Sequence, residues 1–233
     1  MVELVGVAGV GKSHLKMQLA VHLRGRYVDV MATRPSLRNA HLLAAATRRL
    51  APLFRYVMLS SLKNLLPRLN YCLQLLRYAW REELAWRASP QPEFIVSDEG
   101  WFHKLRRIRR FLRPDLAYLD LPASVRRRLF RPDIVVFVTA DEYVICARKL
   151  RRKGEDVTPE ALAAQHARSG ALGQWGEREL TTRDLEQAAA SDGLRYVEID
   201  YRDDFDVASE LLPILEESLM LRDGSQRATA PSP

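Results

Sequence analysis

A glycine-rich stretch near the amino terminus holds the residues whose spacing most clearly indicates chemistry. Residues 6–13 read GVAGVGKS, which fits the pattern G-x-x-x-x-G-K-[ST]. Its glycines let the backbone come close to a polyphosphate, so that successive N–H groups donate to phosphate oxygens. Lys12 would reach the β- and γ-phosphates, and the Ser13 hydroxyl would hold Mg²⁺. The stretch therefore predicts a site for a nucleoside triphosphate.

A pair of acidic residues, Asp98 and Glu99, follows a second short apolar segment. In open α/β sheets ligands bind beyond the carboxyl ends of the strands, so we expect this pair to face the glycine-rich stretch. One carboxylate there could orient Mg²⁺ or its waters. The other could accept the proton of an attacking hydroxyl or position an attacking water. The residues alone leave open which of the two is the base.

Arginines close the predicted helix that follows the fourth strand, where residues 147–154 read ARKLRRKG. Arg148 and Arg152 are four residues apart and share one helical face, and Arg151 lies on an adjacent face. Arginines on a mobile lid would neutralise the charge of a phosphoryl group during its transfer. Cations in a last helical turn are also what the helix dipole favours, so a purely structural role is the competing interpretation.

Three further residues are candidates for contacting an acceptor substrate. Arg34 and Arg38 directly follow the second predicted strand, at the edge of the sheet where ligands bind. Either could hold an anionic group, and a plain turn is the alternative. Trp101 follows the acidic pair and could line the acceptor pocket. An aromatic side chain at the start of a helix is more commonly part of the core.

Short Val/Ile-rich runs separated by helical patterns predict the elements that position these residues. Strands are expected at residues 2–5, 27–31, 93–97, 133–138 and 195–199. Helices are expected at 13–23, 36–50, 53–65, 67–87, 101–112, 124–130, 141–152, 159–168 and 205–221. This alternation predicts a parallel sheet covered on both faces. Residues 222–233 are rich in Gly, Ser, Ala and Pro and predict a disordered tail.

Residues 32–92 are nearly all helical in pattern, with arginines interleaved among apolar residues. Such a segment could close over an acceptor, form a homodimer interface or lie against a membrane surface. A helical subdomain with a buried apolar face is the plainer interpretation.

Composition narrows the classes of protein that the chain can belong to. The net charge is +7, and residues 101–153 contain fifteen Lys or Arg against five Asp or Glu. Phosphate handling explains part of this excess, so no nucleic acid is expected as a partner. No run of 18 uncharged apolar residues is present, and residue 1 leads directly into the first strand, so neither a membrane span nor a signal peptide is expected. Cys72 and Cys146 lack metal-ligand spacing and predict buried thiols in a reducing cytoplasm.

Taken together, these motifs resemble the P-loop nucleoside and nucleotide kinases, particularly the thymidylate-kinase-like members. The resemblance rests on GVAGVGKS, the TRP triplet at 33–35, SDEG at 97–100 and ARKLRRKG. It implies an α/β three-layer sandwich with a five-stranded parallel sheet in the order 2-3-1-4-5. A single domain of residues 1–221 would carry a helical acceptor-binding insertion at 32–92 and a lid at 148–170.

The resemblance also implies an activity: transfer of the γ-phosphoryl group of ATP, with Mg²⁺, to a small-molecule acceptor. A nucleotide, a sugar and an amphiphilic metabolite all remain open as the acceptor. The catalytic residues would be Lys12, Asp98, Glu99, Arg148 and Arg152, and the metal ligands Ser13 and Asp98. The nucleotide would contact Gly6, Ala8, Gly9, Val10, Gly11, Lys12, Ser13, His14 and Arg151, and the acceptor Arg34, Arg38 and Trp101.

Two other functions are compatible with the same residues. A P-loop ATPase module coupled to a partner or membrane would use Asp98 on Mg²⁺ and Glu99 to activate water. A nucleotide-dependent binding protein at a membrane would use the basic middle segment.

Overall fold

The computed structural model of the chain describes residues 1–59, 65–88, 90, 92–111, 116–130, 132–218 and 220. Five strands form one sheet: β1 (Val2–Val5), β2 (Tyr27–Asp29), β3 (Phe94–Ser97), β4 (Ile134–Thr139) and β5 (Tyr196–Asp200). Their order is β2-β3-β1-β4-β5, and every neighbouring pair is parallel. The predicted α/β fold class and strand order are confirmed.

The helices follow the predicted alternation with the strands. They are α1 (Lys12–His22), α2 (Ala40–Leu59), α3 (Leu65–Trp86), α4 (Trp101–Phe111), α5 (Ala123–Leu129), α6 (Glu142–Lys153), α7 (Pro159–Ala171) and α8 (Gln174–Asp192). Two 3₁₀ helices (Leu37–Asn39 and Tyr118–Asp120) and a π-helical turn (Val207–Leu211) complete them. The π-helical turn continues as an α-helix over residues 212–218.

Two helices differ from the sequence-based expectation. Helix α2 runs through Pro52, where the sequence predicted a break. Leu50 and Leu53 flank this proline and are fully buried, so their packing outweighs the lost backbone hydrogen bond. Helix α8 was not predicted, because its sequence is polar on nearly every face. Only Asp184, Leu185 and Ala188 of α8 are buried, which is too few for a recognisable apolar stripe.

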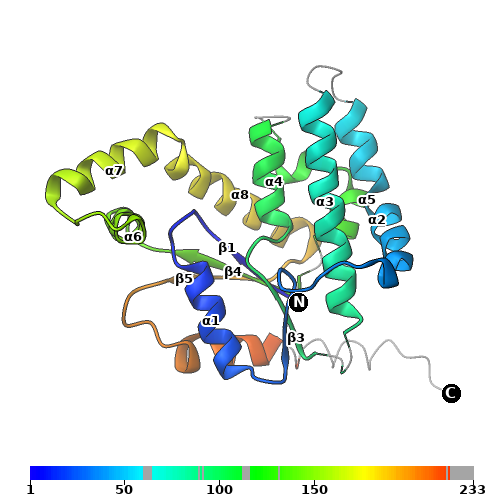
Figure 1. Cartoon of the computed structure of the whole chain (residues 1–233), viewed down its shortest axis with the longest axis horizontal. Helices are drawn as coiled ribbons and strands as arrows, with labels where there is room; N and C mark the ends of the chain where they lie inside the picture. The colour runs from blue at the N-terminus through cyan, green and yellow to red at the C-terminus, as the bar shows by residue number, and fades with distance from the viewer. Residues whose placement is uncertain are drawn as a thin grey trace.

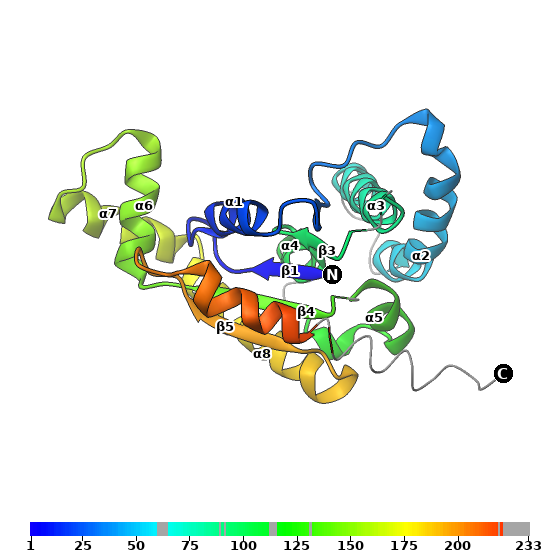
Figure 2. The same cartoon turned by 90° about the horizontal axis from the view of Figure 1, so that it is seen from below.

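The sheet separates two apolar clusters, as strand periodicity requires. Val2 and Leu4 of β1 pack with α1 and the helix that starts at Val207. Val5 of β1 and Phe137 of β4 point to the opposite face, toward α4, α5 and α8. Figure 1 shows the sheet between α1 below it and α4 and α8 above it, and in Figure 2, seen from below, the helix that follows Val207 lies over β4 and β5.

The two helical regions that the sequence singled out lie on opposite sides of the glycine-rich loop (residues 6–13). Figure 1 shows α2 and α3 side by side, next to α4 and α5, while α6 and α7 extend away from the other side. Gly154, in the left-handed conformation, ends α6, and the Thr158 side chain caps α7, so the predicted lid spans the turn between these helices. The predicted tail lies outside the described residues. No helix among the residues described is long and apolar enough to cross a membrane.

Candidate functional site

The glycine-rich loop joins β1 to α1 through backbone conformations that require glycine. Gly6 has φ 151°, and a Cβ added there would lie 2.4 Å from the carbonyl oxygen of Val138. Gly11 has φ 111°, and its added Cβ would lie 2.6 Å from the ring of Tyr201. The loop therefore lies against the ends of β4 and β5, and Gly11 starts α1. Unpaired N–H groups at this helix start favour an anion.

Lys12 folds back over the loop. Its Nζ donates hydrogen bonds to the carbonyl oxygens of Gly6 at 2.7 Å and Val7 at 3.0 Å. Burial and, to a smaller extent, the positive charge of Arg106 lower the pKa of Lys12 to about 8, against opposing contributions from Asp98 and Glu99. An anion bound beside this ammonium would favour its charged form.

Asp98 is held at the end of β3 by two side chains of α1. Ser13 Oγ donates to Asp98 Oδ2 at 3.4 Å, and Lys16 Nζ donates to Oδ1 at 2.9 Å. The same Lys16 ammonium lies 2.9 Å from Asp29 at the end of β2. Burial acts to lower the pKa of Lys16, but hydrogen bonds to both carboxylates raise it. Lys16 thus fixes α1 to two strand ends and orients Asp98.

Glu99 has a different environment from Asp98. Its carboxylate lies 3.2 Å from Lys104 Nζ, and its side chain is 40% exposed. Glu99 is therefore held by one ion pair and remains open to solvent.

A single cavity of about 380 Å³ brings these groups together. Loop residues lie on one side, the acidic pair and α4 on another, and α6 on a third. The lining residues are Ala8, Gly9, Gly11, Lys12, Ser13, His14, Asp98, Glu99, His103, Arg106, Arg148, Lys149 and Arg152.

Arg148 links the loop to the end of β5. Its guanidinium donates to the carbonyl oxygens of Val10 at 2.8 Å and Tyr201 at 3.0 Å, and to Asp203 at 2.9 Å. It also lies 5.3 Å from the centre of the Tyr201 ring. The hydrogen bond from Arg148 lowers the pKa of Asp203. Most donors of Arg148 are therefore occupied by the protein itself.

The neighbouring Lys149 connects the loop to the predicted lid. Its Nζ donates to Ser169 Oγ of α7 at 3.0 Å and to Gln174 at the start of α8, and it lies 5.6 Å from the Trp175 ring centre. A Cβ added at Gly9 would lie 3.0 Å from the Lys149 side chain. Lys149 thus packs over the loop.

Several residues named from the sequence lie elsewhere. Arg34, Arg38 and Arg151 are exposed and do not line the cavity. Trp101 is 1% exposed and donates from Nε1 to Glu82 at 2.9 Å, so its ring is in the core. Gly6 and Val10 belong to the loop without lining the cavity.

Sequence reasoning assigned no role to four cations or polar groups of the site: Lys16, His103, Arg106 and Lys149. The available signal was spacing, since Lys16 follows Lys12 by one helical turn and Arg106 follows His103 by three residues. Without the position of each helix, that signal could not be separated from ordinary charged helix surfaces.

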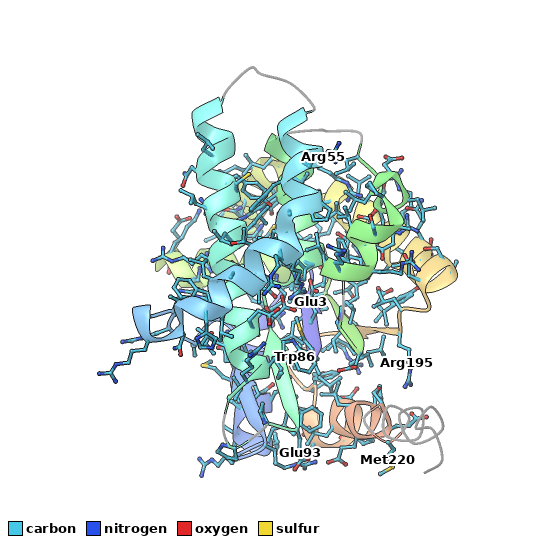
Figure 3. All side chains as sticks on the ribbon, turned by 90° about the vertical axis from the view of Figure 1, so that its right-hand side faces the viewer. Glu3, Arg55, Trp86, Glu93, Arg195 and Met220 are labelled. Carbon is cyan, nitrogen blue, oxygen red and sulfur yellow. The ribbon has the colours of Figure 1, made fainter. Side chains whose placement is uncertain are left out.

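A buried carboxyl group, Glu3 of β1, positions α4. Its Oε1 accepts a hydrogen bond from the Phe102 N–H at 2.8 Å, at the start of α4. Burial raises the pKa of Glu3 to about 8. A Cβ added at Gly100 would lie 2.1 Å from the Glu3 carboxyl carbon, so glycine in the SDEG motif makes room for this group. Figure 3 shows Glu3 near the centre of the view, with side chains around it.

No family model matches the sequence, and no curated protein matches it. Among solved structures, the chain is similar to deoxyadenosine kinase from M. mycoides with bound dCTP, at 12% identity and a TM-score of 0.40, covering 93% of this chain and 98% of that one. It is also similar to the same enzyme with bound dATP, at 14% identity and a TM-score of 0.36, covering 93% and 97%.

Proposed function

We propose that the chain is an ATP-dependent phosphotransferase that moves the γ-phosphoryl group to a hydroxyl or phosphate of a small-molecule acceptor. The observation that carries this proposal is one cavity in which Lys12 and Ser13 face Asp98 and Glu99. The loop amides and Lys12 would hold the β- and γ-phosphates of ATP. Cations of α4 and α6 in the same cavity would offset the charge of the phosphates.

The residues present fit a bound Mg²⁺. Mg²⁺ prefers oxygen ligands and is usually bound by one or two carboxylates together with substrate phosphates and water. Ser13 Oγ and Asp98 Oδ2 are two such oxygens, 3.4 Å apart beside the loop. Among the described residues, no group of three or more His, Cys, Asp or Glu could hold a metal ion. A bound Mg²⁺ would offset part of the negative charge on the phosphate oxygens.

Glu99 is the better placed of the two acidic residues to act as the base. Asp98 is engaged by Ser13 and Lys16, whereas the Glu99 carboxylate is solvent-accessible at the cavity wall. A carboxylate in this position can accept the proton of an acceptor hydroxyl as the new bond to phosphorus forms.

Replacing Lys12 by Ala tests the proposal. We expect Lys12→Ala to lower phosphate transfer by at least about 100-fold, because it removes a cation from the transferring group. Transfer is measured as ADP release during a screen of nucleosides, nucleotides, sugars and amphiphilic alcohols. Arg24→Ala is the matched control, since Arg24 is exposed beyond the far end of α1. Full activity of Lys12→Ala would contradict the proposal.

The same assay separates the kinase from an ATPase module. Slow ADP release that an acceptor accelerates, with a phosphorylated product, supports the kinase. Rapid ADP release that no metabolite changes supports an ATPase in which Glu99 positions water.

A further inference from the structure

The inner face of α4 supplies a cation that sequence reasoning did not assign. His103 and Arg106 of α4 are three residues apart, so they share one side of the helix, and both line the cavity together with Glu99, which precedes the helix. Arg106 forms an ion pair with Glu177 of α8, and these side chains are 20% and 18% exposed. Its guanidinium is therefore held at the cavity wall by a neighbouring element.

Lys12 of the glycine-rich loop and Arg106 of α4 both line the cavity. The charge of Arg106 lowers the pKa of Lys12, which means that the two groups lie within electrostatic reach. The repulsion between two such cations is relieved when an anion lies between them. The γ-phosphoryl group of ATP is the anion that the proposed function puts there.

The arginines of α6 do not replace this group. Arg148 donates to two backbone carbonyls and to Asp203, so it is committed to the loop and the end of β5. Arg152 is exposed, and within the described part of the chain it has no ion pair or hydrogen bond. Arg106, by contrast, forms an ion pair with Glu177. Among the arginines that line the cavity, Arg106 is thus the one whose guanidinium is held by an ion pair and, within the described residues, donates no hydrogen bond to a backbone carbonyl.

His103 supports the same assignment. Its Nε2 is buried without a hydrogen-bond partner within the described part of the chain. Burial lowers the pKa of His103 to about 3, and the nearby charges of Lys104, Lys12 and Arg106 act in the same direction. The ring is therefore neutral, and it adds a polar group to the cavity without a charge that would compete with Arg106 for the anion.

We propose that Arg106 is a catalytic residue that binds the γ-phosphoryl group opposite Lys12, and that Glu177 is a positioning residue that presents the Arg106 guanidinium. This inference rests on the proposed function. In the transfer, an acceptor oxygen bonds to the γ-phosphorus, the bond to the β–γ bridging oxygen breaks, ADP leaves, and the acceptor proton passes to Glu99. Arg106 would stabilise the charge on the γ-oxygens during this exchange.

Nucleotide binding tests the inference without knowledge of the acceptor. Calorimetry compares Mg²⁺-ADP with the Mg²⁺ complex of the β,γ-imido analogue of ATP, because these ligands differ in the γ-phosphoryl group. We expect Arg106→Gln to lower the affinity for the triphosphate analogue by about tenfold or more, while the affinity for ADP changes by less than about threefold. Arg106→Lys should recover part of the lost affinity for the triphosphate analogue. Glu177→Gln should lower that affinity by about threefold.

Arg107→Gln is the matched control. Arg107 is the next residue of α4, does not line the cavity and donates to Gln74 at 3.4 Å, so both affinities should stay at the wild-type values. Thermal unfolding of each variant shows whether the fold is retained.

The possible outcomes distinguish a failure of this inference from a failure of the proposed function. Equal weakening of both ligands in Arg106→Gln indicates a structural role and overturns the inference, as does unchanged binding of both. In either case the proposed function stands, since the wild type still binds ATP. A wild-type protein that binds neither ligand overturns the proposed function together with the inference.

Discussion

Asp98 and Glu99 are adjacent in the chain, but their surroundings give them different chemistry. Asp98 contacts Ser13 and Lys16, two side chains of the helix that follows the glycine-rich loop. Glu99 pairs only with Lys104 among the described ion pairs and stays accessible from the cavity. The first environment suits a carboxylate that holds a cation in place, and the second suits one that accepts a proton.

Substitution of each acid separates these roles. Asp98→Asn should raise the Mg²⁺ concentration for half-maximal phosphate transfer by at least about tenfold, because it removes charge from the metal site. Glu99→Gln should lower kcat by about 100-fold to 10,000-fold without changing the Mg²⁺ requirement, because it removes the base. Initial rates over a Mg²⁺ titration measure both effects. If Glu99→Gln instead raised the Mg²⁺ requirement and Asp98→Asn lowered kcat alone, Glu99 would be the metal ligand and Asp98 the base.

At the scale of the elements, a network around one buried ion pair joins the helical insertion to the rest of the protein. Arg49 of α2 lies 2.9 Å from Glu82 of α3, and these side chains are 5% and 0% exposed. Glu82 also accepts from Trp101 of α4, while Arg49 donates to backbone carbonyls of Arg128 and Leu129 around the end of α5. This network holds four helices in one arrangement and explains why Trp101 is in the core.

Breaking the pair should destabilise the whole helical region. Arg49→Met leaves Glu82 buried without a counter-charge, so we expect a loss of about 3–5 kcal/mol in the free energy of unfolding, measured with urea. Arg48→Met is the matched control at an exposed position and should change stability by less than about 0.5 kcal/mol.

The double variant Arg49→Met with Glu82→Gln shows whether charge is the cause. It removes the buried charge and keeps an acceptor for Trp101, so it should recover about half of the loss or more. A double variant as unstable as Arg49→Met alone would contradict the explanation.

At the scale of the whole molecule, Glu3 makes stability depend on pH. Burial, with the charge of Glu82 acting in the same direction, raises its pKa from 4.5 to about 8 in the folded protein, against backbone hydrogen bonds from the start of α4. The positive charge of Lys104 interacts with the Glu3 carboxyl group. Because the folded state binds this proton more tightly, its contribution is complete below pH 4.5 and is lost as the pH rises toward 8.

Glu3→Gln tests this linkage, because the amide has the shape of the protonated acid and does not titrate. Between pH 5 and pH 8 the wild type should lose on the order of 3 kcal/mol relative to Glu3→Gln. Urea unfolding of both proteins at several pH values measures the difference. Parallel stability curves would show that Glu3 does not titrate in this range.

The strands were predictable because their signals are local, whereas their order was predicted through the resemblance to P-loop kinases. Short Val/Ile runs alternate with helical segments, and motif positions along the chain placed the strands to within a few residues. Helix α8 and the continuous α2 were not predictable in this way. The polar surface of α8 hides its few buried residues, and the packing of Leu50 and Leu53 carries α2 past Pro52.

The amino-acid sequence by itself determined the α/β fold class and the position of the glycine-rich loop, because backbone sterics and apolar periodicity act over a few neighbouring residues. The strand order was predicted only through the resemblance of the motifs to P-loop kinases. Only the tertiary structure decided which charged side chains meet at the cavity. It placed Arg106 and His103 at the cavity wall, left Arg34 outside and buried Trp101. The direction of a helical side chain depends on which face of its helix packs against distant parts of the chain, and no local pattern records that.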